Sequence, residues 1–200
     1  MRSWARGEGR VFWKRKASTP FQEQIEPHLR ALYNFALELA GPSDAEDLVH
    51  TAVLRALERW DEIAGRQHLR TWLFVVLRNA WIDSLRQRGR RGDVSVNDPA
   101  ASDLGCAIPA AEQTAAEQEW ARAIWGALRS LPETYRVPVY LRDVEGFTYR
   151  EIGEILGCPI GTVMSRLARG RALLRAQLLA QVQERGWQPK RKTGTQGHEL

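Results

Sequence analysis

The sequence TYREIGEILGCPIGTVMSRLARGR, from Thr148 to Arg171, decides how the second half of the chain folds. Thr148 and Glu151 have the spacing of a capping box, in which two residues satisfy free amide groups at a helix start. Gly157 is typical of a helix end, and Pro159 is typical of the first turn of a following helix. The stretch therefore predicts two short helices joined by a tight turn.

The second of these helices has two different faces. Its apolar residues recur at helical spacing on one side, at Ile160, Val163, Met164 and Leu167. Its polar residues fall on the other side, at Thr162, Ser165, Arg166 and Arg169. This pattern is typical of a recognition helix that enters a DNA groove. A pair of surface helices with solvated arginines fits the spacing equally well, so the pattern alone leaves both interpretations open.

Charge is distributed unevenly along the chain. The sequence has 29 basic and 24 acidic residues, and residues 1–20 alone carry a net charge of +5. Segments 84–92 and 160–175 each carry four arginines and no acid, whereas residues 93–120 carry six acids and no base. Two basic patches separated by an acidic segment are typical of a protein that contacts nucleic acid at two places.

Helical spacing of apolar residues also runs through the first half of the chain. Residues 21–40 follow it, and Pro27 predicts a break or a helix start inside that segment. Ser43 and Glu46 have capping-box spacing and open a helix that reaches Trp60. The apolar stripe predicted for this helix comprises Ala45, Leu48, Val49, Ala52, Val53, Ala56, Leu57 and Trp60.

A polar loop is expected over residues 61–70, followed by a helix over 71–91 in which aromatic and polar residues are interleaved. The aromatic residues are Trp72, Phe74 and Trp81, and the polar ones are Arg78, Asn79, Arg86 and Arg88. Such interleaving is typical of single-stranded DNA binding, because bases stack on aromatic rings while polar groups contact phosphates and base edges. The general tendency of aromatic residues to be buried places most of these rings in a core instead.

Two further helices are predicted before the opening stretch, over residues 113–128 and 130–144. Ser130 and Glu133 give the second one capping-box spacing, and Pro138 should kink this helix or move its start. The patterns together predict an all-α protein with two small helical domains and a flexible connection. The predicted parts are a basic mobile arm (1–20), a first domain (21–88), a flexible acidic linker (89–112), a second domain with the helix-turn-helix (113–180) and a basic tail (181–200).

Several classes of function are excluded by what the sequence lacks. It has no GxGxxG motif, no P-loop and no nucleophile–base pair, so we expect no enzyme and no cofactor. Cys106 and Cys158 are far apart and belong to no CxxC motif, which argues against a zinc site and a disulfide framework. No apolar run has the length of a membrane span or a signal peptide. We therefore expect a cytoplasmic protein without membrane insertion.

Three blocks of sequence resemble one family, and the resemblance covers about residues 21–180. The blocks are DAEDLVHTAVLRAL (44–57), LRTWLFVVLRNAWIDSLR (69–86) and LRSLPETYRVPVYLRDVEGFTYREIGEILGCPIGTVMSRLARGRALLR (128–175). Their identity and order resemble the extracytoplasmic-function sigma factors, the small two-domain members of the bacterial sigma-70 family. The resemblance implies an RNA polymerase sigma factor that directs promoter-specific transcription initiation.

The resemblance also implies partners and contact residues. The first domain would bind the clamp helices of RNA polymerase core, and the second would reach its flap. The implied polymerase-binding residues are Asp44, Glu46, Asp47, Leu48, Thr51 and Arg55. An anti-sigma factor that covers the polymerase-binding surfaces is a further implied partner.

Promoter DNA would be bound at two elements. The implied minus-ten contacts are Arg70, Arg78, Asn79 and Arg86, with Asn79 the first choice for holding a base out of the stack. The implied minus-thirty-five contacts are Arg142, Thr162, Ser165, Arg166 and Arg169, of which Arg142 would contact phosphate. The acidic linker would run through polymerase toward the RNA path.

Three departures from the family's pattern involve four residues. His50 and Thr51 stand where relatives often have Gln and an acid, and Met164 stands where many relatives carry Lys or Arg. Met164 therefore removes one possible phosphate or base contact. Gly153 replaces the common Ala, at a cost to the helix of about 1 kcal/mol.

Two other classes of protein fit parts of the sequence. A stand-alone helix-turn-helix regulator would bind duplex DNA as a dimer, but there is no heptad seam or ligand-binding domain. A nuclease would need clustered metal-binding carboxylates. Asp44, Glu46 and Asp47 lie in the first turn of one helix, where interaction with the helix dipole explains them.

Overall fold

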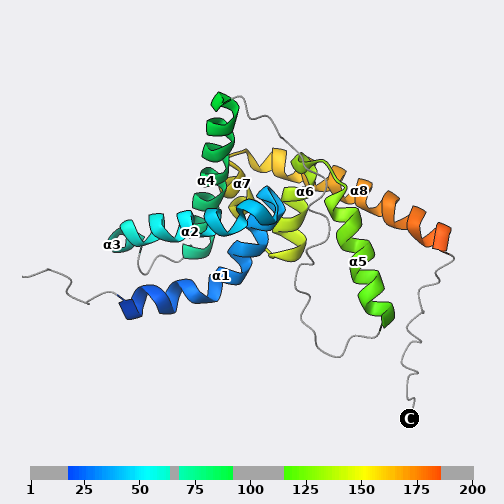
Figure 1. Ribbon diagram of the computed structural model, residues 1–200. Helices are drawn as coiled ribbons and strands as arrows, with labels where there is room; N and C mark the ends of the chain where they lie inside the picture. Colours follow the sequence, from blue (N-terminus) through cyan, green and yellow to red (C-terminus); the bar gives the residue numbers. More distant parts are fainter. Residues whose placement is uncertain (1–17, 64–67, 92–114, 186–200) are drawn as a thin grey trace, which may run out of the picture.

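The computed structural model describes residues 18–63, 68–91 and 115–185, and every regular element in these ranges is helical (Figure 1). The first half comprises α1 (Ser18–Ala40), α2 (Pro42–Glu58), α3 (Trp60–Ile63) and α4 (Leu69–Arg91). The second half comprises α5 (Ala115–Arg129), α6 (Glu133–Val139), a π-helical segment (Tyr140–Val144), α7 (Tyr149–Leu156) and α8 (Ile160–Arg185). The all-α prediction is confirmed. Residues 1–17 of the predicted arm, most of the linker and much of the tail lie outside the described residues, and the last three residues of the predicted arm already belong to α1.

The starts of α1 and α2 differ from the sequence-based expectations. The break expected at Pro27 is wrong, because α1 continues through it and buries Ile25 and Leu32 on either side. The Ser43 capping box is also wrong. The residue that caps α2 is Gly41, with a φ of 76°, so Ser43 already lies inside the helix and makes no cap hydrogen bond.

The polar loop expected over residues 61–70 is only partly correct. Residues 61–63 belong to α3, which buries Trp60 and Ile63. Arg70 lies in the first turn of α4, which begins at Leu69. Arg70 is therefore a helical residue with a defined side-chain direction, and not a loop residue as expected.

The helix predicted over 130–144 begins later than expected. Pro132 is the N-cap of α6 and no side chain caps it, since the Ser130 hydroxyl instead donates to the carbonyl of Ala127 at 2.8 Å. Pro138 lies inside α6 without moving its start. The helix widens into the π-helical segment immediately afterwards, where the Glu145 amide donates to the carbonyl of Tyr140 at 3.1 Å.

The helix-turn-helix is confirmed as predicted. The Glu151 amide donates to the Thr148 hydroxyl at 3.3 Å, and the Thr148 amide donates to the Glu151 carboxylate at 2.8 Å. Gly157 ends α7 with a φ of 58°, a left-handed conformation that favours glycine. Gly153 is required by the tight turn, because a Cβ there would lie 2.9 Å from the backbone oxygen of Cys158.

The two halves pack against each other through aromatic side chains. Phe74 of α4 stacks on Phe35 of α1, with ring centroids 4.9 Å apart. Across the interface, Phe74 contacts Phe147 at 4.7 Å and Phe35 stacks on Tyr140 at 6.0 Å. One cluster of buried residues therefore spans both halves. Figure 1 shows α7 lying beside α4, while α5 and the far end of α8 extend away from the packed centre.

Candidate nucleic-acid interface

The first turns of α8 expose a mixed face rather than a purely polar one. Val163 and Leu167 are buried, as the apolar stripe predicted. Ile160 and Met164, which were placed on the same stripe, are 48% and 54% exposed. They lie at the edge of the stripe, where Ile160 still borders α7 near Gly153.

The predicted polar residues of α8 differ in their exposure. Ser165 and Arg169 are exposed, whereas Thr162 and Arg166 are half-buried. The Ser165 hydroxyl donates to the carbonyl of Thr162 at 3.0 Å. Arg166 turns back toward the α7–α8 turn, with a guanidinium nitrogen 4.0 Å from the sulfur of Cys158. Arg169 is therefore freer than Arg166 to contact a partner.

Arg142 is held near the start of α7. Its guanidinium donates to the carbonyl of Phe147 at 2.8 Å and lies over the ring of Tyr149, 5.2 Å from the centroid. These contacts use part of its hydrogen-bonding capacity and fix its direction. Arg171, which the sequence patterns did not indicate, pairs with Asp143. The hydrogen bond between them raises the pKa of the Arg171 guanidinium. The pair ties α8 to the π-helical segment.

The four minus-ten candidates divide between two faces of α4. Asn79 and Arg86 are both exposed, and their spacing of seven residues places them on the same face. Arg86 also pairs with Asp83 at 3.6 Å. Arg70 and Arg78 point elsewhere, toward the second half of the chain.

Arg70 is engaged by the second half through several contacts. It donates to the carbonyl of Glu145 at 3.0 Å and pairs with the Glu145 carboxylate at 2.5 Å. Its guanidinium lies 4.2 Å from the centroid of the Phe147 ring. Next to it, the Thr71 hydroxyl donates to the carboxylate of Glu151 at 3.0 Å. Arg70 is thus part of the contact between the two halves.

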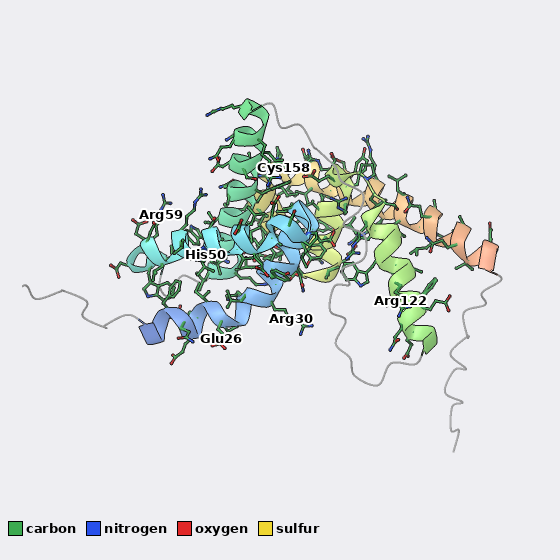
Figure 2. All side chains as sticks on the ribbon, in the orientation of Figure 1. Glu26, Arg30, His50, Arg59, Arg122 and Cys158 are labelled. Atoms are coloured by element: carbon green, nitrogen blue, oxygen red, sulfur yellow. The ribbon has the colours of Figure 1, made fainter. Side chains whose placement is uncertain are left out.

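Arg78 lies beside the α7–α8 turn. A Cβ built on Gly157 would be 3.8 Å from its guanidinium. Figure 2 shows Cys158, the next residue of this turn, next to α4. Partial burial lowers the pKa of Arg78, which reflects the cost of removing its charge from water.

A second ionic cluster joins the halves at Glu38 of α1. Arg129 and Arg136 approach its carboxylate at 3.7 and 3.8 Å, and Arg136 also donates to its carbonyl at 3.3 Å. Burial raises the pKa of Glu38, and the two arginines oppose that shift. No feature of the sequence indicated this cluster, because Glu38 is distant in sequence from both arginines.

The polymerase candidates on α2 also separate by exposure. Glu46 and Asp47 are exposed, and Asp44, Thr51 and Arg55 are half-buried. Asp44 pairs with Arg88, and Arg55 pairs with Asp83 at 3.4 Å. Leu48 is only 6% exposed, so its side chain packs in the core and is not part of the surface.

Two leucines of α2 are exposed instead. Leu57, which the predicted stripe placed inside, is 50% exposed, and Leu54 is 45% exposed. His50, which lies one helical turn before Leu54 on α2, is also exposed; Figure 2 labels its side chain. Their spacing on α2 could have suggested a second apolar face, but only the packing of α1 and α4 decides which face is covered.

Other kinds of site find no support in the described part of the chain. Within it, no group of His, Cys, Asp and Glu side chains is arranged to hold a metal ion. None of the helices described is both long and apolar enough to cross a membrane. The fold and the exposed face of α8 define a helix-turn-helix DNA-binding protein.

Comparison with known proteins identifies the family. Residues 24–91 match the family Sigma-70 region 2, and residues 121–174 match Sigma-70 region 4. The ECF RNA polymerase sigma factor EcfG of Rhodopseudomonas palustris is 38% identical over 154 residues, covering 76% of this chain and 80% of that protein. The ECF RNA polymerase sigma-E factor of Escherichia coli is 32% identical over 134 residues, covering 64% of this chain and 70% of that protein.

A solved structure agrees with these matches. The sigma factor RpoE from Bartonella quintana, in complex with the anti-sigma factor NepR, superposes with a TM-score of 0.63 at 31% identity. The match covers 80% of this chain and 96% of that one. The chain therefore belongs to the extracytoplasmic-function sigma factors of the sigma-70 family. It is an RNA polymerase sigma factor, which binds core polymerase and directs transcription from specific promoters; the family acts in transcription initiation and is not a family of enzymes.

Proposed function

We propose that this sigma factor binds polymerase core and the two promoter elements through three separate surfaces. The exposed face of α2 binds polymerase core, Asn79 and Arg86 on α4 contact the minus-ten element, and the first turns of α8 read the minus-thirty-five element. The observation that carries the proposal is the exposed start of α8, where Ser165 and Arg169 face outward directly after the helix-turn-helix. The chain has no catalytic role of its own in this scheme.

The polymerase surface consists of exposed and half-buried residues of α2. Asp47 and Thr51 contribute polar groups, and Leu54 contributes an exposed apolar side chain between them and the end of the helix. An apolar side chain with polar groups around it matches the apolar core and polar rim of a protein interface. Leu48 supports this surface from inside rather than contacting the partner.

The minus-ten surface consists of Asn79 and Arg86 as long as the two halves stay packed together. In that state Arg70 is held by Glu145, so it contacts DNA only after the halves separate. Binding of polymerase and promoter would supply the free energy for this separation. The closed arrangement is therefore proposed as the state of the free factor.

Control by an anti-sigma factor is part of the proposal. The support is the similarity to the Bartonella quintana sigma factor, whose solved structure contains the anti-sigma factor NepR. A protein that binds the closed arrangement would keep Arg70 engaged and block α2. The proposed compartment is the cytoplasm, where polymerase acts.

Replacing Asn79 by Ala tests the assignment of the minus-ten surface. With core polymerase, the variant should form closed promoter complexes as wild type does, but the fraction of open complexes should be at least tenfold lower. The reason is that contacts to a flipped base offset the few kcal/mol that unstacking costs. Permanganate reactivity of unpaired thymines measures opening, and gel retardation measures binding.

Gln87→Ala is the matched control, because Gln87 is an exposed polar residue of α4 that the proposal does not place on the minus-ten surface. Its opening should equal that of wild type. Equal losses of binding and opening in Asn79→Ala would contradict the assignment.

A further inference from the structure

The apolar pair on α8, Ile160 and Met164, is only partly covered by the rest of the fold. Ile160 and Met164 are one helical turn apart and are 48% and 54% exposed. Val163 and Leu167 already fill the contact with α7 and α6, at 0% and 1% exposed. The pair projects from the first two turns of the helix, next to the turn that follows α7.

The line of residues next to this pair is unusually small. Gly161, Ser165 and Ala168 are all exposed on the outer side of α8. A Cβ added at Gly161 would meet nothing within 4 Å, so packing does not require a glycine there. Gly170 is different, because a Cβ there would lie 2.8 Å from Val139. Small side chains along the outer line allow another surface to approach the helix backbone closely.

The charge around the pair indicates what kind of surface this is. Residues 160–175 contain four arginines and no acid, and Arg171 among them is paired with Asp143 of the π-helical segment. Arg169 is exposed on the other side of the small residues from Met164. A partner that matches this face is anionic, admits a helix and presents an apolar group beside its polar ones. The major groove of duplex DNA meets these conditions, and the C5-methyl group of thymine is its apolar group.

We propose that Met164, supported by Ile160, reads the C5-methyl group of thymine in the minus-thirty-five element. The inference rests on the proposed function, because it takes α8 as the helix that enters the groove. The flexible thioether side chain of Met164 adapts its contact to the methyl group. On this proposal Met164 does more than remove a phosphate contact, because it helps to determine which base pairs are preferred.

Replacing thymine by deoxyuridine tests this directly, because deoxyuridine keeps every hydrogen-bonding group and lacks only the methyl group. Holoenzyme is assembled with core polymerase and bound to a promoter fragment identified by run-off transcription. Each thymine of the minus-thirty-five element, on either strand, is replaced in turn. Wild type should lose about fourfold in affinity at one or two positions, the value expected for one buried methyl group.

Met164→Ala should bind the thymine fragment about fourfold more weakly and show no further loss with deoxyuridine. Its fold should be unchanged by circular dichroism and thermal melting, since Met164 is exposed. Leu173→Ala is the matched control. Leu173 is 41% exposed further along the same helix, and its variant should keep the full discrimination.

The outcomes distinguish a failure of this proposal from a failure of the proposed function on which it rests. Equal binding of thymine and deoxyuridine by wild type at every position, or a minus-thirty-five element of G·C pairs alone, would overturn the role of Met164. Binding that does not change when the whole minus-thirty-five element is scrambled would overturn the proposed use of α8 itself.

Discussion

At the scale of single residues, the two central arginines of α8 have different surroundings. Arg169 is exposed on the outer face, whereas Arg166 is turned toward the sulfur of Cys158 and is half-buried. Sequence spacing treats them alike because both lie on the polar side of the helix. Their roles should therefore differ, with Arg169 contacting DNA bases and Arg166 supporting the α7–α8 turn.

Replacing Arg169 by Ala should remove a base contact. The preference for an intact over a scrambled minus-thirty-five element should fall about tenfold, within the 1–3 kcal/mol expected of a bidentate arginine. Affinity for core polymerase should not change. Fluorescence anisotropy with labelled promoter fragments measures the first quantity, and Arg175→Ala, which removes an exposed charge two turns away, should affect both DNA fragments equally.

Glu38 provides a test of the contact between the two halves through pH. Burial raises its pKa above the ordinary value of 4.5, despite Arg129 and Arg136. The native state then holds the proton more tightly than the unfolded state does. The contribution of Glu38 to the free energy of unfolding therefore decreases as the pH rises from the ordinary pKa through the raised one.

Glu38→Gln removes this titration and keeps the shape of the side chain. Relative to wild type, its free energy of unfolding should increase as the pH is raised from about 4 to about 8. Urea unfolding followed by circular dichroism measures the difference, with Glu154→Gln, an exposed position on α7, as control. A variant that becomes relatively less stable with rising pH would show that the ion pairs outweigh burial.

At the scale of elements, the glycines of the helix-turn-helix have opposite functions. Gly153 lets α7 pass close to the carbonyl of Cys158, whereas Gly161 leaves open space. In sequence, both are glycines inside a predicted helix and carry the same cost. The structure shows that this cost is offset by packing at Gly153 only.

Gly153→Ala should destabilise the protein by about 1–3 kcal/mol, because the backbone must shift to admit the methyl group. Gly161→Ala should leave stability unchanged or raise it by up to about 1 kcal/mol, through better helix propensity. Thermal and urea unfolding measure both variants. Equal stabilisation of the two would mean that the turn accommodates a side chain without strain.

The elements that the sequence predicted best are those with local signals. The capping box at Thr148, the helix end at Gly157 and the apolar spacing of α7 and α8 involve residues close in sequence. The predicted start of α2 was wrong, because Gly41 with its positive φ caps the helix in place of Ser43. Which side of α2 is covered could not be predicted either, since the neighbours that cover it are distant in sequence. The exposure of Leu54 and Leu57 follows from that packing.

At the scale of the whole molecule, the two halves form one packed body in the described residues. Glu145 is central to it, because its carboxylate accepts from Arg70 and from the hydroxyl of Tyr140 at 2.8 Å. The sequence could not predict this contact, because separate domains with a flexible connection fit the same patterns. The consequence for the candidate site is that the Arg70 guanidinium is engaged by Glu145 and Phe147 while the contact lasts.

Glu145→Ala should weaken the contact between the halves. Arg70 would lose its charge partner while still partly buried, which costs about 1–3 kcal/mol. The radius of gyration from small-angle scattering should increase relative to wild type. Glu154→Ala, which removes an exposed carboxylate from α7, should leave it unchanged. An unchanged radius for both would contradict a closing role for Glu145.

The most direct test of the account is run-off transcription on genomic fragments, with purified core polymerase and the full chain. We predict that transcripts start at a defined set of promoters only when both proteins are present. Arg169→Ala should reduce the use of that set while still binding polymerase. A chain that supports transcription from no promoter, but binds duplex DNA as a dimer without polymerase, would contradict the account.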